Sequence, residues 1–154
     1  MSTPADNPGV VVRPPFLYGG AFLVVLACRW PWRLPIFDGG TLWPGLALIA
    51  IAIAFMIWGR RTLAAAGTNI NPALPTTAIV TTGPFRFSRN PLYVGLTLTY
   101  LGFVLAVNTW WGVVVLIPLL TIMHRGVVLR EERYLEAKFG ESYRQYCARV
   151  RRYL

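Results

Sequence analysis

The order of apolar and polar positions along the chain predicts four membrane-spanning helices. Long stretches with almost no charge alternate with shorter polar connections, and the stretches cover about residues 15–28, 42–58, 92–107 and 110–123. A run of about fifteen residues spans only about 22 Å, whereas the hydrocarbon core of a bilayer is roughly 30 Å thick. We therefore expect flanking polar and aromatic residues to complete each crossing.

The ends of these stretches carry the residues expected at a membrane interface. All six tryptophans lie at or near them: Trp30, Trp32, Trp43, Trp58, Trp110 and Trp111. Only Asn108 and Thr109 separate the last two stretches, which predicts a tight helical hairpin. The expected fold is a single all-α integral membrane domain over residues 1–154, with about four transmembrane helices and cytoplasmic C-terminal helices.

Composition excludes several other classes of protein. With 55% hydrophobic and 14% charged residues, the chain is too apolar for an ordinary soluble domain of 154 residues. Its net charge of +9 is spread beside the apolar stretches, so we expect membrane lipids and no nucleic acid as partners. One histidine and the distant, free cysteines Cys28 and Cys147 offer no metal ligand set, so no metal site is predicted.

The first apolar stretch has one alternative interpretation. Residues 25–28 read Val-Leu-Ala-Cys, which loosely resembles a lipoprotein cleavage box, and the stretch has the length of a signal-peptide core. Cleavage there would remove one span from an already minimal bundle. We therefore expect the first helix to be retained.

Basic residues predict the orientation. If all four stretches cross, thirteen basic residues fall on one side and only Arg29 and Arg33 on the other. Because positive charge concentrates on the cytoplasmic side, both termini, the loop 59–91 and the tail 124–154 are expected in the cytoplasm. A site built from that loop and tail would face the cytoplasm.

Residues 83–95, GPFRFSRNPLYVG, place polar side chains at the mouth of the third stretch. Such groups are costly there unless something polar binds them. Ser88 or Asn90 is expected to cap a helix that opens at Pro91, with backbone amides directed at a bound anion. The alternative is a well-capped transmembrane helix whose arginines meet lipid headgroups.

The tail is expected to continue the fourth stretch as a helix that stops at Gly140, followed by a second helix from Glu141 to about Arg151. Glu131 and Glu132 would point about 100° apart on that first helix. One of them can bind a cationic group while the other pairs with a basic neighbour, such as Arg130 or Arg133. The alternative is ordinary surface salt bridging at helical spacing.

Together these motifs resemble the isoprenylcysteine carboxyl methyltransferase family and the related phospholipid N-methyltransferases. The similarity runs from about residue 58 to 154, and the matching positions are Arg89, Asn90, Pro91, Tyr93 and Gly95, then Glu131 and Glu132, then Phe139, Gly140, Tyr143 and Tyr146. Asn90 departs from the family pattern, which commonly has histidine there. An amide cannot titrate near neutrality, so a proton-transfer role is in doubt at this position while a binding role is not.

The resemblance implies an S-adenosylmethionine-dependent enzyme that methylates a lipophilic acceptor. Its implied cofactor-binding residues are Asn90, Pro91, Tyr93, Gly95, Glu131 and Glu132, and its implied catalytic residues are Arg89, Arg130 and Glu132, the arginines steering an anionic acceptor. The resemblance also implies a cofactor pocket unrelated to that of the soluble Rossmann methyltransferases, and consistently the chain has no GxGxxG motif. Methyl transfer from a sulfonium needs mainly positioning and desolvation, and a carboxylate acceptor needs no general base.

Other functions remain open from the sequence. The first alternative is a phospholipid N-methyltransferase of the phosphatidylethanolamine type. The others are an NADPH-dependent membrane reductase of the sterol type, for which this chain is short, and a non-catalytic membrane module.

Four glycines predict close helix contacts, which could support a homodimer or shape an internal pocket: Gly95, Gly102, Gly112 and Gly126. In the third stretch, Tyr100 with Thr97 or Thr99 are the polar groups expected to face protein or ligand rather than lipid.

Overall fold

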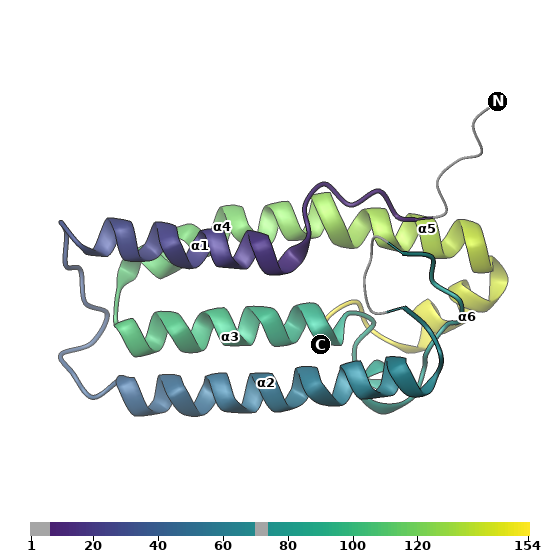
Figure 1. Cartoon of the computed structure of the whole chain (residues 1–154), viewed down its shortest axis with the longest axis horizontal. Helices are drawn as coiled ribbons and strands as arrows, with labels where there is room; N and C mark the ends of the chain where they lie inside the picture. Colours follow the sequence, from purple (N-terminus) through teal and green to yellow (C-terminus); the bar gives the residue numbers. More distant parts are fainter. Residues whose placement is uncertain (1–6, 70–73) are drawn as a thin grey trace.

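The computed structural model describes residues 7–69 and 74–154, and helices are the only regular secondary structure in these ranges. In chain order the elements are α1 (Pro14–Arg29), α2 (Leu42–Ala65), the 3₁₀ turn η1 (Gly83–Arg86), α3 (Pro91–Val107), α4 (Trp110–Ile122), the π-helix η2 (Met123–Val128), α5 (Leu129–Phe139) and α6 (Glu141–Arg149). Figure 1 shows four long helices packed lengthwise, with α5 and α6 beyond one end of the bundle.

The helix boundaries agree with the apolar pattern except where polar residues continue a helix. α1, α3 and α4 begin and end within about one residue of the predicted stretches. α2 runs on to Ala65, past the predicted end at 58, because the polar residues after Trp58 are also good helix formers. α6 ends at Arg149, two residues before the predicted end, and residues 150–154 form no regular secondary structure.

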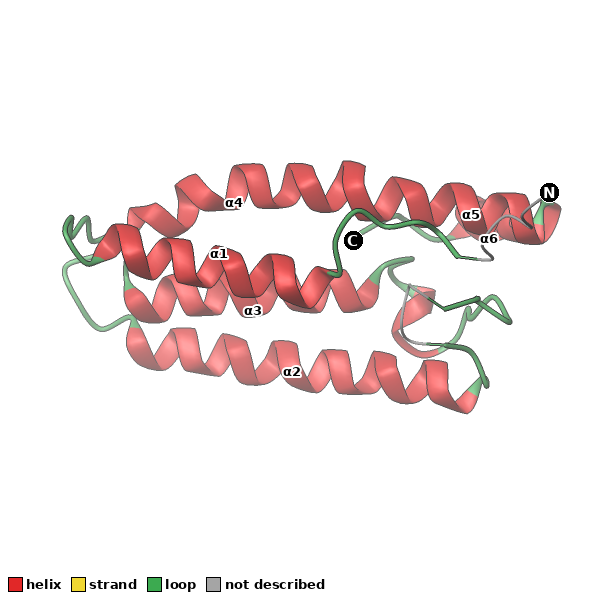
Figure 2. Ribbon diagram, turned by 45° about the horizontal axis from the view of Figure 1, so that its top comes forward, coloured by secondary structure: helices red, strands yellow, loops and turns green. Residues whose placement is uncertain are grey.

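α3 lies at the centre of the bundle. Figure 2 shows α1 between α4 and α3, with α2 on the opposite side of α3. The contact between α2 and α3 is close because glycines face the partner helix: a Cβ on Gly102 would lie 2.8 Å from Ile49 Cγ1, and one on Gly95 would collide with Met56. Gly95 and Gly102 are therefore helix-packing residues inside one chain.

The connection between α3 and α4 is as short as predicted. Asn108 ends α3 with a left-handed backbone (φ 49°), and its side chain binds the α1–α2 loop through Ile36 N and Phe37 N at 3.0 Å each. The helices of this hairpin are bridged by α1, which contributes Tyr18 and Val25 to a core shared with α3 and α4. This core joins α3 to α4 together with direct contacts near the turn, where Gly112 of α4 packs against Val104 of α3.

The polar groups of α3 face the protein interior, as predicted. The Tyr100 side chain is fully buried, and its hydroxyl donates to Gly112 O at 2.8 Å. Thr97 Oγ1 lies 2.7 Å from Tyr18 Oη and donates to Tyr93 O. Each hydroxyl therefore has a partner away from lipid.

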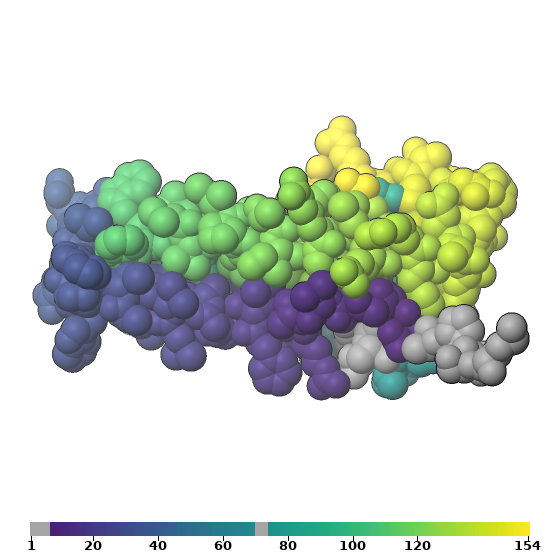
Figure 3. Space-filling model, turned by 90° about the horizontal axis from the view of Figure 1, so that it is seen from above, coloured from purple at the N-terminus to yellow at the C-terminus, as the bar shows by residue number. Residues whose placement is uncertain are grey.

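Within the described ranges, two helices are long and apolar enough to cross a membrane: the 24-residue Leu42–Ala65 and the continuous 30-residue helix Trp110–Phe139, which α4, η2 and α5 form together. α1 and α3 are apolar but shorter, with 16 and 17 residues. Large apolar side chains are exposed along α1, α2 and α4. In Figure 3, α1 and α4 lie side by side along the length of the molecule, and the C-terminal residues gather at one end.

Residues before α1 bind the π-helix at that same end. Val11 N donates to Gly126 O at 3.1 Å, and Arg130 Nη1 donates to Gly9 O at 3.0 Å. The carbonyl of Gly126 in η2 thus has a partner outside the long helix.

Candidate active site

The segment 83–95 forms one wall of a cavity at the end of the bundle. η1 is followed by a turn, and α3 opens at Pro91 as predicted, with Asn90 in the N-cap position. Neither Ser88 nor Asn90 makes the expected capping hydrogen bond from its side chain to the helix. Instead Ser88 Oγ accepts from Asn90 N at 3.1 Å, and Asn90 Nδ2 donates to Arg152 O at 3.0 Å.

The cavity has a volume of about 550 Å³. Its polar wall consists of side chains from the predicted motifs: Arg89, Asn90, Tyr93, Glu131, Glu132, Tyr143 and Tyr146. Loop residues 76 and 78–80 line another side. Motifs about forty residues apart in the sequence therefore meet at one cavity.

Glu131 is the cavity carboxylate without a cationic partner among the described residues. Its Oε2 accepts a hydrogen bond of 2.7 Å from the Tyr93 hydroxyl, which links α5 to the first turn of α3. A carboxylate has about four acceptor positions, so this single bond leaves most of its capacity open. A cation in the cavity would be stabilised beside it.

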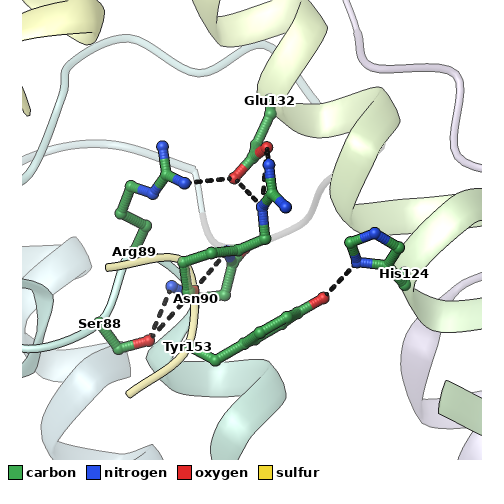
Figure 4. A network of polar contacts seen from close by, with 7 residues as sticks. Ser88, Arg89, Asn90, His124, Glu132 and Tyr153 are labelled. Atoms are coloured by element: carbon green, nitrogen blue, oxygen red, sulfur yellow. Dashed lines mark hydrogen bonds and ion pairs between the residues drawn. The ribbon is translucent and has the colours of Figure 1, made fainter. Parts of the chain in front are cut away.

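Glu132 is held by two arginines. Its Oε1 lies 3.2 Å from Arg89 Nη2, and Arg152 donates to both carboxylate oxygens at 2.8–3.1 Å (Figure 4). Only 14% of the Glu132 side chain and 12% of the Arg89 side chain is exposed. The sequence predicted a basic partner for one of the paired glutamates, and the structure gives Glu132 partners distant in the chain instead of Arg130 or Arg133.

Arg89 keeps one donor free. Its Nη2 is bound to Glu132, but its Nε is buried and has no hydrogen-bond partner among residues 7–69 and 74–154. A buried unsatisfied donor costs about 1–3 kcal/mol, more for a charged group. Because Arg89 also lines the cavity, a ligand with an acceptor group would remove this cost.

Tyr143 and Tyr146 of α6 close the same wall. Burial raises the pKa of the Tyr143 hydroxyl above its usual range, Cys147 and Glu132 act in the same direction, and Arg89 opposes them. Burial likewise raises the pKa of Tyr146 above its usual range. Both hydroxyls are therefore protonated at neutral pH, and that of Tyr146 donates to Phe85 O at 2.7 Å.

Three of the predicted site residues do not line the cavity. Pro91 is buried as the first residue of α3, and Gly95 packs against Met56 of α2. Arg130 is exposed, and its guanidinium donates to Gly9 O outside the cavity. Of the two arginines proposed to steer an acceptor, Arg89 is at the site and Arg130 is not.

The opposite wall combines apolar and basic side chains from α1 and α2. Phe16, Met56 and Leu63 line it, together with Arg13 and Arg60. Neither of these two guanidinium groups makes a hydrogen bond or an ion pair within the described residues. α1 and α2 pack on different sides of α3 (Figure 2), and all three helices contribute residues to the lining of the cavity.

Sequence reasoning missed three residues here. Arg13 and Arg60 entered only the count of basic residues that predicts orientation, and Arg152 belongs to a basic run, ARVRRYL, in which no spacing distinguishes one arginine from another. Only the fold shows which of them reaches the site. The described residues also contain no group of three or more side chains able to hold a metal ion.

The unequal partners of the paired glutamates predict unequal effects on stability. Glu132→Gln leaves the mostly buried Arg89 without its counter-ion, and we expect it to lower the free energy of unfolding by about 3 kcal/mol. Glu131→Gln retains an oxygen that can accept from Tyr93, and we expect a change below about 1 kcal/mol. Thermal unfolding in detergent measures both, and an equal loss in the two variants would contradict this assignment.

Comparison with known proteins agrees with the arrangement of the site. A family model described as phospholipid methyltransferase matches residues 41–142, which contain α2 to α5 and the cavity residues Arg89, Tyr93, Glu131 and Glu132. An "Uncharacterized protein" of Haemophilus influenzae is 38% identical over 66 residues, which cover 41% of this chain and 100% of that protein. No solved structure matches the chain. Taken with its apolar helices, these matches mean that the chain is a membrane protein and belongs to the phospholipid methyltransferase family.

Proposed function

We propose that the cavity binds S-adenosylmethionine and that the protein transfers its methyl group to a lipophilic acceptor. The observation that carries this proposal is that two charged side chains of one cavity, a glutamate and an arginine, have hydrogen-bonding groups that the protein leaves without partners. Glu131 offers a carboxylate without a cation, and Arg89 offers a buried Nε donor without an acceptor. The amino-acid end of the cofactor carries an ammonium and a carboxylate, and its sulfonium adds a second cation.

The dimensions and surface of the cavity fit this ligand. Its volume of about 550 Å³ lies within the roughly 300–1,000 Å³ of pockets that enclose small molecules. Phe85, Tyr93 and Tyr143 contribute aromatic rings beside the charged groups. Aromatic faces stabilise cations, including sulfonium-type onium groups, without forming hydrogen bonds.

Each residue of the polar wall then has a defined task. Glu131 binds a cationic group of the cofactor, and Tyr93 orients Glu131. Arg89 binds the cofactor carboxylate through Nε, while Glu132 binds its Nη2. When bound, the cofactor supplies a methyl group already activated by positive sulfur. The protein contributes position and exclusion of water.

The wall between α1 and α2 is the proposed acceptor side. An amphiphilic acceptor would place its apolar part beside Phe16, Met56 and Leu63 and its anionic group beside Arg13 and Arg60. Both the carboxylate of an isoprenylcysteine and the phosphate of a phospholipid have this character. The family description agrees with the phospholipid, while a carboxylate acceptor needs no base and suits a site where Asn90 is bound to Arg152 O.

This function requires the bundle to sit in a bilayer. We propose that α1 to α4 all cross and that the cavity end is cytoplasmic. The outward apolar side chains of α1, α2 and α4 and the basic residues at the cavity end support this orientation.

Calorimetric titration of S-adenosylmethionine into the detergent-purified protein tests the cofactor assignment. We expect binding by the wild type and an affinity about ten- to a hundredfold lower in Glu131→Gln and Arg89→Gln, because each loses a charge-assisted interaction of about 1.5–3 kcal/mol. Glu136→Gln, on the exposed face of the same helix, is the matched control and should bind normally.

A titration with NADPH distinguishes the alternatives. Selective binding of NADPH would overturn the methyltransferase assignment in favour of a reductase. Binding of neither compound by folded protein would favour a non-catalytic membrane module.

The acceptor side predicts a separation of kinetic effects. We expect Arg13→Gln and Arg60→Gln to raise the KM for an anionic amphiphilic acceptor about tenfold, since each removes one ion pair with the acceptor, and to leave cofactor affinity unchanged. Steady-state methyl transfer to an isoprenylcysteine and to a phospholipid, assayed in parallel, measures this. An unchanged KM for both acceptors would contradict the proposed acceptor side.

A further inference from the structure

The last five residues of the chain return to the beginning of α3. After α6, residues 150–154 run beside the segment 88–90 (Figure 4). Arg89 N donates to Arg151 O at 2.9 Å, and Asn90 Nδ2 donates to Arg152 O at 3.0 Å. The chain end thus supplies backbone acceptors to two residues of the polar wall.

The Arg152 side chain fixes the orientation of Glu132. Its Nε lies 2.9 Å from Oε1 and 3.1 Å from Oε2, and its Nη2 lies 2.8 Å from Oε2. Such fork-like pairing defines the plane of the carboxylate as well as its position. Hydrogen bonding to Glu132 raises the pKa of the Arg152 guanidinium, so this group stays charged.

A second contact holds the segment on the other side of Arg152. Tyr153 Oη lies 2.8 Å from His124 Nδ1 in the π-helix η2. Arg152 is therefore flanked by backbone bonds to α3 and by a side-chain bond to the long helix. These contacts fix the position from which the Arg152 guanidinium reaches Glu132.

A chain of contacts connects Arg152 to the cavity through Glu132 and Arg89. Arg152 fixes Glu132, and Glu132 Oε1 holds Arg89 Nη2 at 3.2 Å. The neighbouring donor of the same planar guanidinium is the buried, unpartnered Nε. If the carboxylate plane turned, Arg89 would turn with it, and its Nε would no longer hold its direction.

We propose that Arg152 is a positioning residue for the cofactor-binding end of the cavity, acting on Arg89 through Glu132. Arg152 does not line the cavity and lies beyond residues 41–142 that match the family. The inference rests on the proposed function, since it assigns to Arg89 the cofactor carboxylate. A chain end that served only to stabilise the fold would have no specific effect through Arg89.

A double-mutant cycle on cofactor affinity separates these two roles. We expect Arg152→Gln to weaken S-adenosylmethionine binding about tenfold. A tenfold change lies in the range of interaction energies measured between side chains of one hydrogen-bond network. Arg152→Lys retains the charge but not the fork, so its loss should be smaller. In the variant that combines Arg152→Gln with Arg89→Gln, binding should be no weaker than with Arg89→Gln alone.

Arg149→Gln is the matched control, because it removes the same charge from an exposed side chain in the same basic run. Thermal unfolding of every variant checks the fold, and if Arg152→Gln does not fold, Arg152→Lys carries the test. Wild-type affinity in the folded Arg152 variant, or losses at Arg152 and Arg89 that add, would overturn the inference. Absence of binding by the wild type would instead refute the proposed function.

Discussion

The structure of this site depends on a single carboxylate, that of Glu132, shared by Arg89 and Arg152. It ties the long helix to the start of α3 and to the chain end, three segments that the sequence separates widely. Removing charges from water is costly, and it is repaid only when each partner is well placed. The two ion pairs of Glu132 therefore form only when the long helix, the start of α3 and the chain end are packed together.

Because Glu132 is ion-paired with two arginines, the adjacent Glu131 is the glutamate available to a ligand. Adjacent residues on a helix point about 100° apart, and this lets Glu131 reach Tyr93 and the cavity while Glu132 reaches the arginines. One glutamate of the pair maintains the site, and the other remains open to a ligand. In the proposed function these are the roles of scaffold and cofactor ligand.

Much of the fold could be predicted from the sequence because the bounds of the apolar stretches are close to the bounds of the helices that they form. The start of α3 at Pro91 and the end of α5 at Gly140 follow from local rules that need no knowledge of neighbours. The π-helix and the extension of α2 to Ala65 could not be predicted this way. The packing of Gly95 and Gly102 within the chain was also unresolved, because a glycine pattern does not say which helix it faces.

The candidate site was predicted as a set of residues but not as a set of contacts. Arg89, Tyr93, Glu131 and Glu132 do line one cavity. Which glutamate would be ion-paired depended on a chain end twenty residues away, and a run of similar arginines carries no signal for the member that reaches inward. Asn90 illustrates the same limit, since its amide binds a backbone carbonyl that only the fold brings near.

The most direct test of the central claim is methyl transfer itself. Purified protein in lipid vesicles, given S-adenosylmethionine with a labelled methyl group and supplied in turn with an isoprenylcysteine and a phospholipid amine, should move label into the lipid phase. The predicted result, at a cofactor concentration that does not saturate the enzyme, is transfer by the wild type that Glu131→Gln lowers in proportion to its weaker cofactor binding and that Glu136→Gln retains. Folded wild-type protein that binds the cofactor and transfers label to neither acceptor, or Glu131→Gln protein that transfers label at the wild-type rate, would contradict the account.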